Sequence, residues 1–248
     1  MQISRDDRVQ MERAHVLAWP ALHTAVVDGW LWRSSGGGSQ RANSVSAIAF
    51  TGRDTAAAID AVEARYEAMG MPARFHTYEH TAPDGLADVL RSRGYAEGEA
   101  TVTMFKRLAP AAAAADVECR DHAWDEWCNV YLGAITESRQ VVNRQILSAI
   151  PRPRSFFGCR KNGEVISTAL CVIGFGCAVV ECVATRSDAR RQGGGRTVMA
   201  GLLSWAAQQD AKVVGLQVAH HNVPALRLYR SLGFTEGATN RFWSRNLA

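Results

Sequence analysis

Apolar residues recur along the chain with two different spacings, and together these spacings predict a mixed α/β protein. Spacings of three or four residues predict helices, over residues 10–23, 55–69, 84–93, 121–133, 138–149, 195–209 and 222–232. Short runs rich in Val, Ile and Cys predict strands, over residues 29–34, 43–50, 73–79, 101–107, 154–160, 164–173, 177–185, 212–218 and 239–245.

The second half of this pattern repeats the first. LRSRGYAEGEA and YRSLGFTEGAT, near the ends of the two halves, both contain R-S-x-G-aromatic-x-E-G. Their glycines, Gly94 and Gly233, are 139 residues apart, and the same offset aligns a helix and a strand upstream without a gap. Such self-similarity predicts two copies of one α/β unit.

An alanine run, LAPAAAAAD at 108–116, divides the two copies. Its composition is typical of a linker. We therefore expect one domain over 1–108, a linker over 109–116 and a second domain over 117–248.

Composition changes this picture little but excludes several classes of protein. The 248 residues are 47% hydrophobic and 21% charged, as in ordinary globular domains. No run approaches the ~18 apolar residues of a membrane span, and the charged start MQISRDDRVQMER is no secretory signal. The net charge of +4 is too small to indicate nucleic-acid binding.

The six cysteines indicate a reducing compartment. None forms a C-x-x-C pair, and no histidines stand at metal-finger spacing. We therefore expect a cytoplasmic protein with reduced thiols and no metal.

One stretch, ARRQGGGRTVMAGLL at 189–203, places glycines and arginines at the start of a predicted helix. The first turn of a helix has free N–H groups and a partial positive charge, and glycine lets an anion approach them. The stretch lacks the Gly-Lys-Ser/Thr of a Walker loop and the G-x-G-x-x-G of a dinucleotide site. It therefore indicates either an anion site or a solvated turn.

Two motifs in order resemble the GNAT-type N-acetyltransferase superfamily. The run from Arg190 to Gly195, RRQGGG, resembles the family's R/Q-x-x-G-x-G/A loop, and NVPALRLYRSLGF at 222–234 resembles its N-x-x-A-x-x-L-Y-x-x-x-G-F signature. The resemblance is close over 154–246, and the first half resembles the degenerate copy of two-domain bacterial members. It implies tandem units, each a mixed, mostly antiparallel sheet flanked by helices, and a loop that holds the pyrophosphate of acetyl-coenzyme A.

The resemblance also implies roles for single residues. Tyr229 would be the general acid for the coenzyme thiolate, with a core aromatic as the alternative. Asn222 would bond the pantetheine arm and also cap its helix. The residues expected to bind the coenzyme are Val183, Ala184, Thr185, Arg190, Arg191, Gln192, Gly193, Gly194, Gly195, Arg196, Asn222 and Tyr229.

Glu181, in the predicted strand VVECVAT, is the candidate base, directly or through water. A charged residue between Val180 and Cys182 is unusual inside a strand, although a salt-bridged structural residue would also explain it. If the strand alternates regularly, Val179, Glu181 and Val183 share a face. His220 and His221 are a second possibility for the base, with surface histidines as the default.

The repeat predicts that the first copy does not bind coenzyme A. At the offset of 139, Tyr229 corresponds to Leu90 and Asn222 to Pro83, and the loop corresponds to 51–56, TGRDTA, which has lost the run of glycines. The polar residues Arg41, Asn43 and Ser44, near Trp30 and Trp32, either shape an acceptor pocket or are structural.

We therefore expect an N-acetyltransferase that moves acetyl from acetyl-coenzyme A to a primary amine by direct attack in a ternary complex. The strand cysteines Cys159, Cys171, Cys177 and Cys182 are too deep for a thiol intermediate. The alternatives are a non-catalytic acyl-coenzyme A-binding regulator and a longer-chain acyl or aminoacyl transferase on the same fold. The acceptor is a small amine or a protein amine, no nucleic acid or membrane is expected, and the chain is a monomer or homodimer.

Overall fold

The computed structural model describes residues 3–109 and 117–247, so most of the predicted linker, 110–116, lies outside the described residues. The helices are α1 (Arg5–Ala18), α2 (Thr55–Glu67), α3 (Leu86–Ser92), α4 (Asp125–Gly133), α5 (Glu137–Ala149), α6 (Gly194–Gln208) and α7 (Val223–Ser231), with short 3₁₀ turns η1 (Arg41–Asn43) and η2 (Ser187–Ala189). The strands are β1 (His23–Val27), β2 (Trp30–Ser34), β3 (Val45–Ser46), β4 (Ala73–Thr77), β5 (Ala96–Arg107), β6 (Val117–Arg120), β7 (Arg154–Lys161), β8 (Glu164–Gly174), β9 (Cys177–Thr185), β10 (Val213–Ala219) and β11 (Thr235–Arg245).

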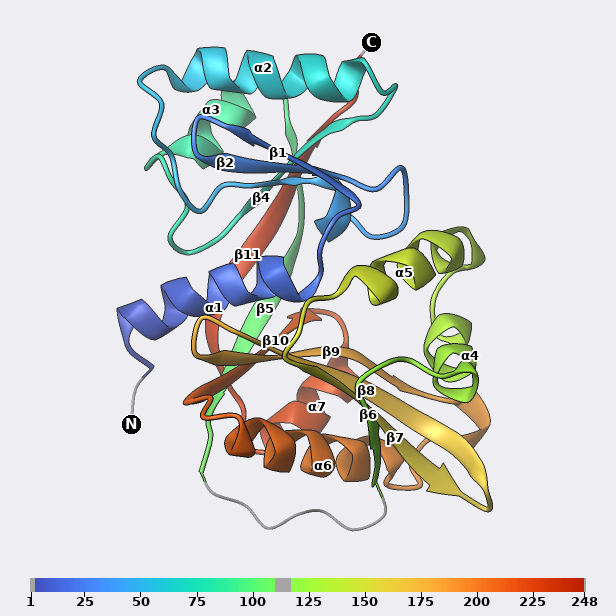
Figure 1. The fold of residues 1–248 in the computed structure, drawn as a ribbon. Coiled ribbons are helices and arrows are strands. Elements are labelled where there is room, and N and C mark those ends of the chain that lie inside the picture. Colours follow the sequence, from blue (N-terminus) through green and yellow to red (C-terminus); the bar gives the residue numbers. More distant parts are fainter. Residues whose placement is uncertain (1–2, 110–116, 248) are drawn as a thin grey trace.

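The strands form one 11-stranded sheet in the order β1-β2-β3-β4-β11-β5-β10-β9-β8-β7-β6. The last strands of the two halves are exchanged within it. β11 pairs with β4 of the first half, whereas β5 pairs with β10 of the second half, and the two exchanged strands also pair with each other. They run through the middle of the molecule in Figure 1 and join the halves.

The mixed, mostly antiparallel sheet flanked by helices confirms the predicted fold class. Among the described strands, only β3 with β4 and β9 with β10 pair in parallel. The predicted repeat is also visible in the elements, because α2, β4, α3 and β5 begin 137 to 140 residues before α6, β10, α7 and β11. The exchange of strands was not predicted.

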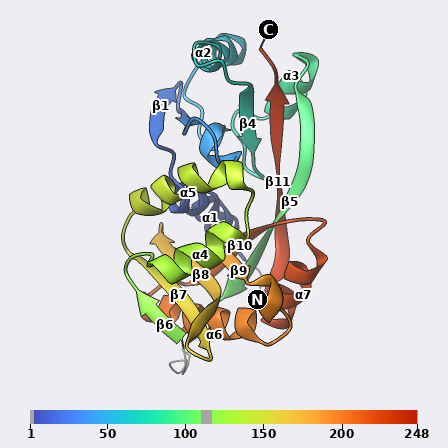
Figure 2. The same cartoon turned by 90° about the vertical axis from the view of Figure 1, so that its right-hand side faces the viewer.

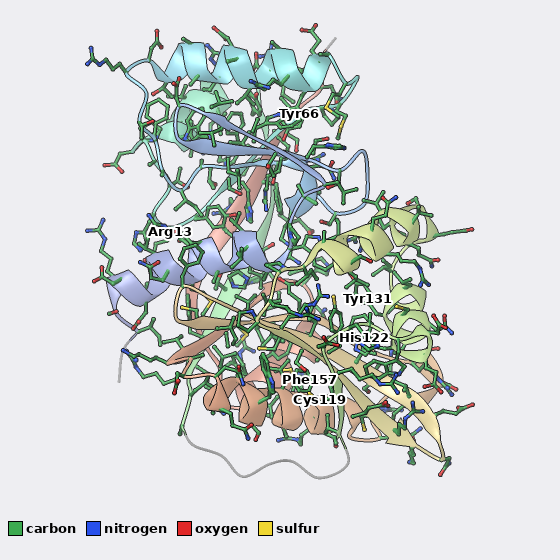
Figure 3. The ribbon with its side chains drawn as sticks, viewed as in Figure 1. Arg13, Tyr66, Cys119, His122, Tyr131 and Phe157 are labelled. Carbon is green, nitrogen blue, oxygen red and sulfur yellow. The ribbon has the colours of Figure 1, made fainter. Side chains whose placement is uncertain are left out.

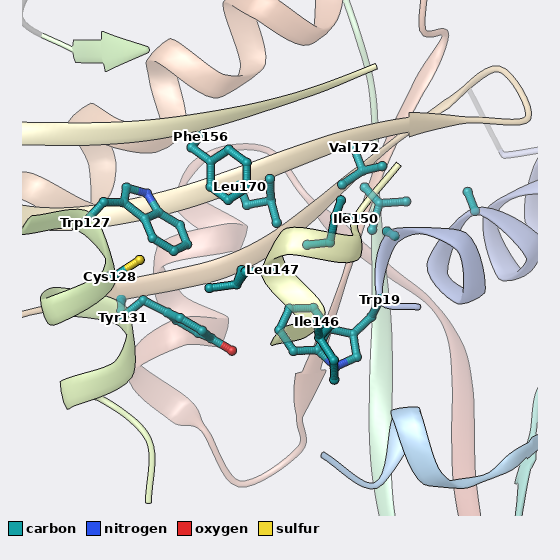
Figure 4. Packing of buried hydrophobic residues seen from close by; sticks show 14 of the residues in the cluster. Trp19, Trp127, Cys128, Tyr131, Ile146, Leu147, Ile150, Phe156, Leu170 and Val172 are labelled. Carbon is teal, nitrogen blue, oxygen red and sulfur yellow. The ribbon is translucent and has the colours of Figure 1, made fainter. Parts of the chain in front are cut away.

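Helices cover both faces of the second half (Figure 2). On one face, α1, α4 and α5 pack on β7 to β10 around Met11, Trp19, Trp127 and Phe156, and Figure 4 shows part of this core. On the other face, α6 and α7 pack around Val198, Leu202, Leu226, Tyr229 and Phe234. Because α1 precedes all first-half strands but packs on β8 and β9, the two halves share their cores.

Several predicted bounds were wrong, for local reasons. The helix predicted over 10–23 begins at Arg5, because Ser4 and Asp7 form a capping box, and it ends before Pro20. β1 then occupies 23–27. The strand predicted over 43–50 reduces to β3, preceded by the turn η1.

The helix predicted over 121–133 was also too long. β6 pairs with β7 over 117–120, so α4 begins only at Asp125. Among the described residues, no helix is long and apolar enough to cross a membrane.

Candidate functional site

The helix α6 begins without a side-chain cap. Gly193 precedes it with φ +85°, a left-handed conformation that favours glycine. Within residues 3–109 and 117–247, no side chain caps the first turn. The side chains of Arg190, Arg191 and Arg196 around it are exposed. This arrangement leaves N–H groups and positive charge for an anion.

The loop, β9 and α7 converge at this helix start. A Cβ on Gly194 would lie 2.4 Å from Ser167 Oγ of β8, so only glycine fits there. A Cβ on Gly195 would lie within 3.4–3.6 Å of Leu228 on α7 and Thr185 on β9. Arg196 donates to Ser231 Oγ at 2.7 Å. The predicted cofactor residues of these three elements are therefore neighbours.

The strands β9 and β10 diverge next to this point. They pair in parallel only as far as Val180 with Leu216, yet β9 continues to Thr185 and β10 to Ala219. No described strand pairs with the edge of β9 over 181–185 that faces β10. An open edge of this kind can pair with an extended ligand as with an added strand.

A β-bulge bends β9 where this edge opens. Between the pairs Leu170 with Glu181 and Thr168 with Ala184, β9 has one residue more than β8. Cys182 takes φ +55°, which is unusual for a residue other than glycine. Bulges often redirect a strand next to an active site.

The bulge makes one sequence prediction wrong. Val179 packs on the α1 side of the sheet, but Val183 packs on the α6 side. The extra residue shifts the alternation by one, so Val183 does not share a face with Val179 and Glu181. Cys182 and Ala184 pack on the α1 side instead.

Tyr229 lies on the buried face of α7, and its ring is 7% exposed. Its ring packs edge-on against Phe234 at a centroid distance of 6.0 Å. Burial raises the pKa of Tyr229, and the negative charge of Glu181 raises it further, so the hydroxyl keeps its proton at neutral pH. Within the described residues no group is hydrogen-bonded to this hydroxyl. It can therefore donate its proton to a ligand.

Glu181 is paired with an arginine of the other half. Arg41 Nη1 and Nη2 donate to Glu181 Oε1 and Oε2 at 2.5 and 2.6 Å, and the Glu181 side chain is only 7% exposed. Burial alone would lower the pKa of Arg41, but the carboxylate beside it raises the pKa above its usual value. The turn η1 thus brings a cation of the first half to a strand of the second half. Glu181 is therefore salt-bridged, as the structural alternative for this residue predicted.

Aromatic side chains surround this ion pair. The Arg41 guanidinium lies 5.5 Å from the centroid of the Trp19 ring. Tyr131 of α4 packs edge-on against Trp19 (Figure 4), and its hydroxyl accepts from Asn143 Nδ2 at 3.0 Å. Burial, then the neighbouring Cys182 and Glu181, raise the pKa of Tyr131. The pair is therefore held in a low-dielectric setting close to the bulge.

The other candidates lie nearer the surface. Asn222 caps α7, and its Oδ1 accepts from Ala225 N at 3.3 Å, which confirms the capping role. His220 and His221 are both exposed, and His221 lies 3.1 Å from Glu99. Neither histidine forms a described contact with Glu181 or Tyr229.

The described residues contain no group of three or more His, Cys, Asp or Glu placed to hold a metal ion. The cysteines of β8 and β9 are poor nucleophiles. Burial raises the pKa of Cys177 to about 11 and raises that of Cys182 well above its usual range, so their thiolates are scarce at neutral pH. Cys119, by contrast, is exposed.

The ion pair between Arg41 and Glu181 was missed by the sequence reasoning. Arg41 was noted only as part of a polar patch, and Tyr131 was not noted at all. One signal was present, because the two charges stand 140 residues apart, close to the repeat offset of 139. Opposite charges at nearly equivalent positions of two copies could have suggested a pair.

Comparisons with known proteins identify relatives of this chain. The family described as "Probable histone acetyltransferase Rv0428c C-terminal" matches residues 7–243. The "Uncharacterized N-acetyltransferase YobR" of Bacillus subtilis is 25% identical over 242 residues, which cover 93% of this chain and 95% of that protein.

Two solved structures share the fold. A GCN5-related N-acetyltransferase from Kribbella flavida has a TM-score of 0.73 at 18% identity and covers 99% of this chain, which in turn covers 98% of it. A tandem GNAT protein from the clavulanic acid biosynthesis pathway has a TM-score of 0.62 at 14% identity, with 82% of this chain and 74% of that one covered. With the family match over most of its length, the chain belongs to this acetyltransferase family and is an acyltransferase of the GNAT superfamily.

Proposed function

We propose that the chain transfers acetyl from acetyl-coenzyme A to a primary amine by direct attack in a ternary complex. The observation that carries this proposal is the alignment of three features: the uncapped start of α6, the open edge of β9 and the protonated hydroxyl of Tyr229. Each of these three features would contact a different part of acetyl-coenzyme A, which is an extended thioester.

The residues present fit the coenzyme. The N–H groups at Gly193, Gly194 and Gly195 would hold its pyrophosphate, with Arg190, Arg191, Gln192 and Arg196 around it. The backbone of Val183, Ala184 and Thr185 would pair with its pantetheine arm, and Asn222 would bond the same arm. When bound, the coenzyme would supply an acetyl group on a good thiolate leaving group.

Two side chains would move protons. Tyr229 would donate its hydroxyl proton to the departing sulfur, because its raised pKa keeps the hydroxyl protonated at neutral pH and available as a donor to the negative charge that develops on the sulfur. Glu181 has both oxygens bonded to Arg41, but a carboxylate has about four lone-pair positions. It would therefore accept the amine proton through a water molecule.

The high pKa of Cys182 supports direct attack rather than an acyl-cysteine. We also propose that the division at residues 109–116 separates a coenzyme-binding second half from a first half that binds none. In the first half, Asp54 already bonds the start of α2. The first half would instead contribute Arg41 to the acceptor side of the site, in a reducing, cytoplasmic setting.

The test is a panel of amines assayed by release of free coenzyme A thiol. Tyr229→Phe should lower kcat by about 100-fold or more while the coenzyme still binds. Tyr95→Phe, which removes a first-half hydroxyl that bonds Glu63, is the matched control and should keep full turnover.

Coenzyme binding is measured separately as a melting shift. Saturation at about 100 times Kd should stabilise the fold by roughly 2.7 kcal/mol. No shift in a folded sample would refute coenzyme binding. A shift without turnover on any amine would favour the regulator, and normal turnover by Tyr229→Phe would refute its role as the acid.

A further inference from the structure

An apolar cavity of about 580 Å³ lies outside the coenzyme site, between the two halves. Its walls come from α1, β2, the segment after β3 and the turn between β8 and β9, and the apolar residues include Val16, Leu17, Leu31, Ile48 and Phe175. None of the α6 loop, β9 or α7 residues lines it. Its volume falls within the ~300–1,000 Å³ of small-molecule sites.

A buried cation lines this cavity. Arg33 is 1% exposed, and its Nε and Nη2 donate to Ser44 O and Ser44 Oγ at 3.2 and 3.3 Å. In the part of the chain that the structure describes, Nη1 has no hydrogen-bond partner and no carboxylate pairs with this side chain. Burial lowers the pKa of Arg33, and the nearby Arg41 lowers it further. A buried charge without a counter-ion is strongly unfavourable unless something supplies one.

The rim of the cavity has the same sign of charge. Arg13 lies on α1 where it meets the first half (Figure 3), is exposed and forms no ion pair among the described residues. The lining residues include these two arginines and no acid. An anion therefore meets two cations here, whereas a cation meets only repulsion.

We propose that this cavity binds a small amphipathic monocarboxylate, with its carboxylate toward Arg33 and its apolar body against the walls from α1 and the β8–β9 turn. Phe175 is 52% exposed in that turn, and a bound apolar body would cover it. The single buried guanidinium favours one compact anionic group over a pyrophosphate.

The cavity is linked to the catalytic side of the molecule by hydrogen bonds. Ser44, which accepts from Arg33, donates its hydroxyl to Arg41 O at 3.1 Å. Arg41 in turn holds Glu181. A ligand on Arg33 would therefore steady the turn that carries Arg41. Binding of a carboxylate here would not require acetyl transfer, because the cavity and its charges alone provide the site.

The test is titration calorimetry of the whole chain with octanoate, compared with 1-octanol and with acetate. We expect one octanoate per chain, 1-octanol at least tenfold weaker, and no measurable acetate binding, because the site needs both the charge and the apolar body. Equal binding of octanoate and 1-octanol, or no octanoate binding, would overturn the proposal.

Two strand variants locate the site. Thr24 lines the cavity, whereas Val26 on the same strand is 69% exposed and does not. Thr24→Trp should weaken octanoate binding at least tenfold, and Val26→Trp should leave it unchanged. Arg33→Met, checked for folding by melting, should remove the preference for octanoate over 1-octanol. Unchanged binding by Thr24→Trp, or an unchanged preference in folded Arg33→Met, would contradict the assignment.

Discussion

The helices α2 and α6 are equivalent elements of the two halves, but they begin in opposite ways. Asp54 precedes α2, and its Oδ1 accepts from Ala56 N and Ala57 N at 2.9 and 3.1 Å. Gly193 stands at the equivalent position, 139 residues later, and leaves the start of α6 without a side-chain cap. One helix carries its own anion, and the other is open to an anion from outside.

The difference shows how one unit can serve two purposes. A carboxylate at the start of a helix accepts from the first N–H groups and offsets the positive end of the helix dipole, so it competes with a phosphate for the same place. The change extends to the next helix, where Leu90 stands in α3 and Tyr229 in α7, and both are buried. The first half thus keeps the packing of the unit without the glycine loop and without the tyrosine hydroxyl.

The first half nevertheless supplies parts of the second. α1 packs on β8 and β9, β5 pairs with β10, and Arg41 binds Glu181. The two halves therefore differ in how their equivalent helices begin, although they share one sheet. Four substitutions test this difference, from the largest expected effect to the smallest.

Arg41→Met should produce the largest effect on stability. It leaves the buried Glu181 carboxylate without a partner, which typically costs about 3–5 kcal/mol. For a chain of 248 residues this corresponds to a fall in Tm of about 10 °C. The double variant Arg41→Met/Glu181→Leu should recover most of the loss. A single variant that melts like the parent would mean that the first half does not stabilise the second through this pair.

Glu12→Gln tests the contact of α1 with both halves through pH. Burial raises the pKa of Glu12 from 4.5 to about 7. The folded chain therefore holds this proton more tightly than the unfolded chain. The protonated Glu12 therefore adds about 3 kcal/mol to the free energy of unfolding, relative to the ionised form. This contribution is full below pH 4.5 and is lost as the pH rises through about 7.

Glutamine stays neutral, so Glu12→Gln should match the parent near pH 4.5 and be more stable by about 3 kcal/mol at pH 8.5. Melting curves at the two pH values measure this difference. The exposed Glu67→Gln is the control and should change nothing at either pH. A constant difference between parent and Glu12→Gln across this range would show that Glu12 is ionised inside the fold.

Local patterns predicted much of what is seen. The spacing of apolar residues predicted both ends of α2, α6 and α7 to within two residues, since each helix is long or flanked by clear signals. These features depend on residues close together in the sequence.

The features that were missed depend on distant residues. The strands β1 and β6 are short, so their pairing with β2 and β7 defines them more than their own composition. The exchange of β5 and β11 is a matter of pairing between distant strands, because β11 pairs with β4 and β5 pairs with β10. The bulge at Cys182 follows from pairing with β8, and the Arg41–Glu181 pair joins residues 140 apart.

Gly193→Asp makes the start of α6 resemble that of α2. The carboxylate would repel a pyrophosphate and compete for the same N–H groups, so we expect coenzyme affinity to fall by about 100-fold, or about 2.7 kcal/mol. Calorimetric titration measures the Kd. Gly70 also has a positive φ and open space around it, so Gly70→Asp controls for backbone strain and should keep normal affinity. Unchanged affinity in Gly193→Asp would remove α6 from the coenzyme site.

Asp54→Ala makes the opposite change and should have the smallest effect. Loss of the cap on α2 should cost about 1 kcal/mol, a fall in Tm of about 2–4 °C. Asp84→Ala, at an exposed position, should stay within about 0.5 kcal/mol of the parent. Coenzyme stoichiometry should remain one per chain, because freeing these N–H groups restores neither the run of glycines in the loop nor a tyrosine at Leu90. A second bound coenzyme would contradict this expectation. It would mean that the Asp54 carboxylate alone prevents coenzyme binding in the first half.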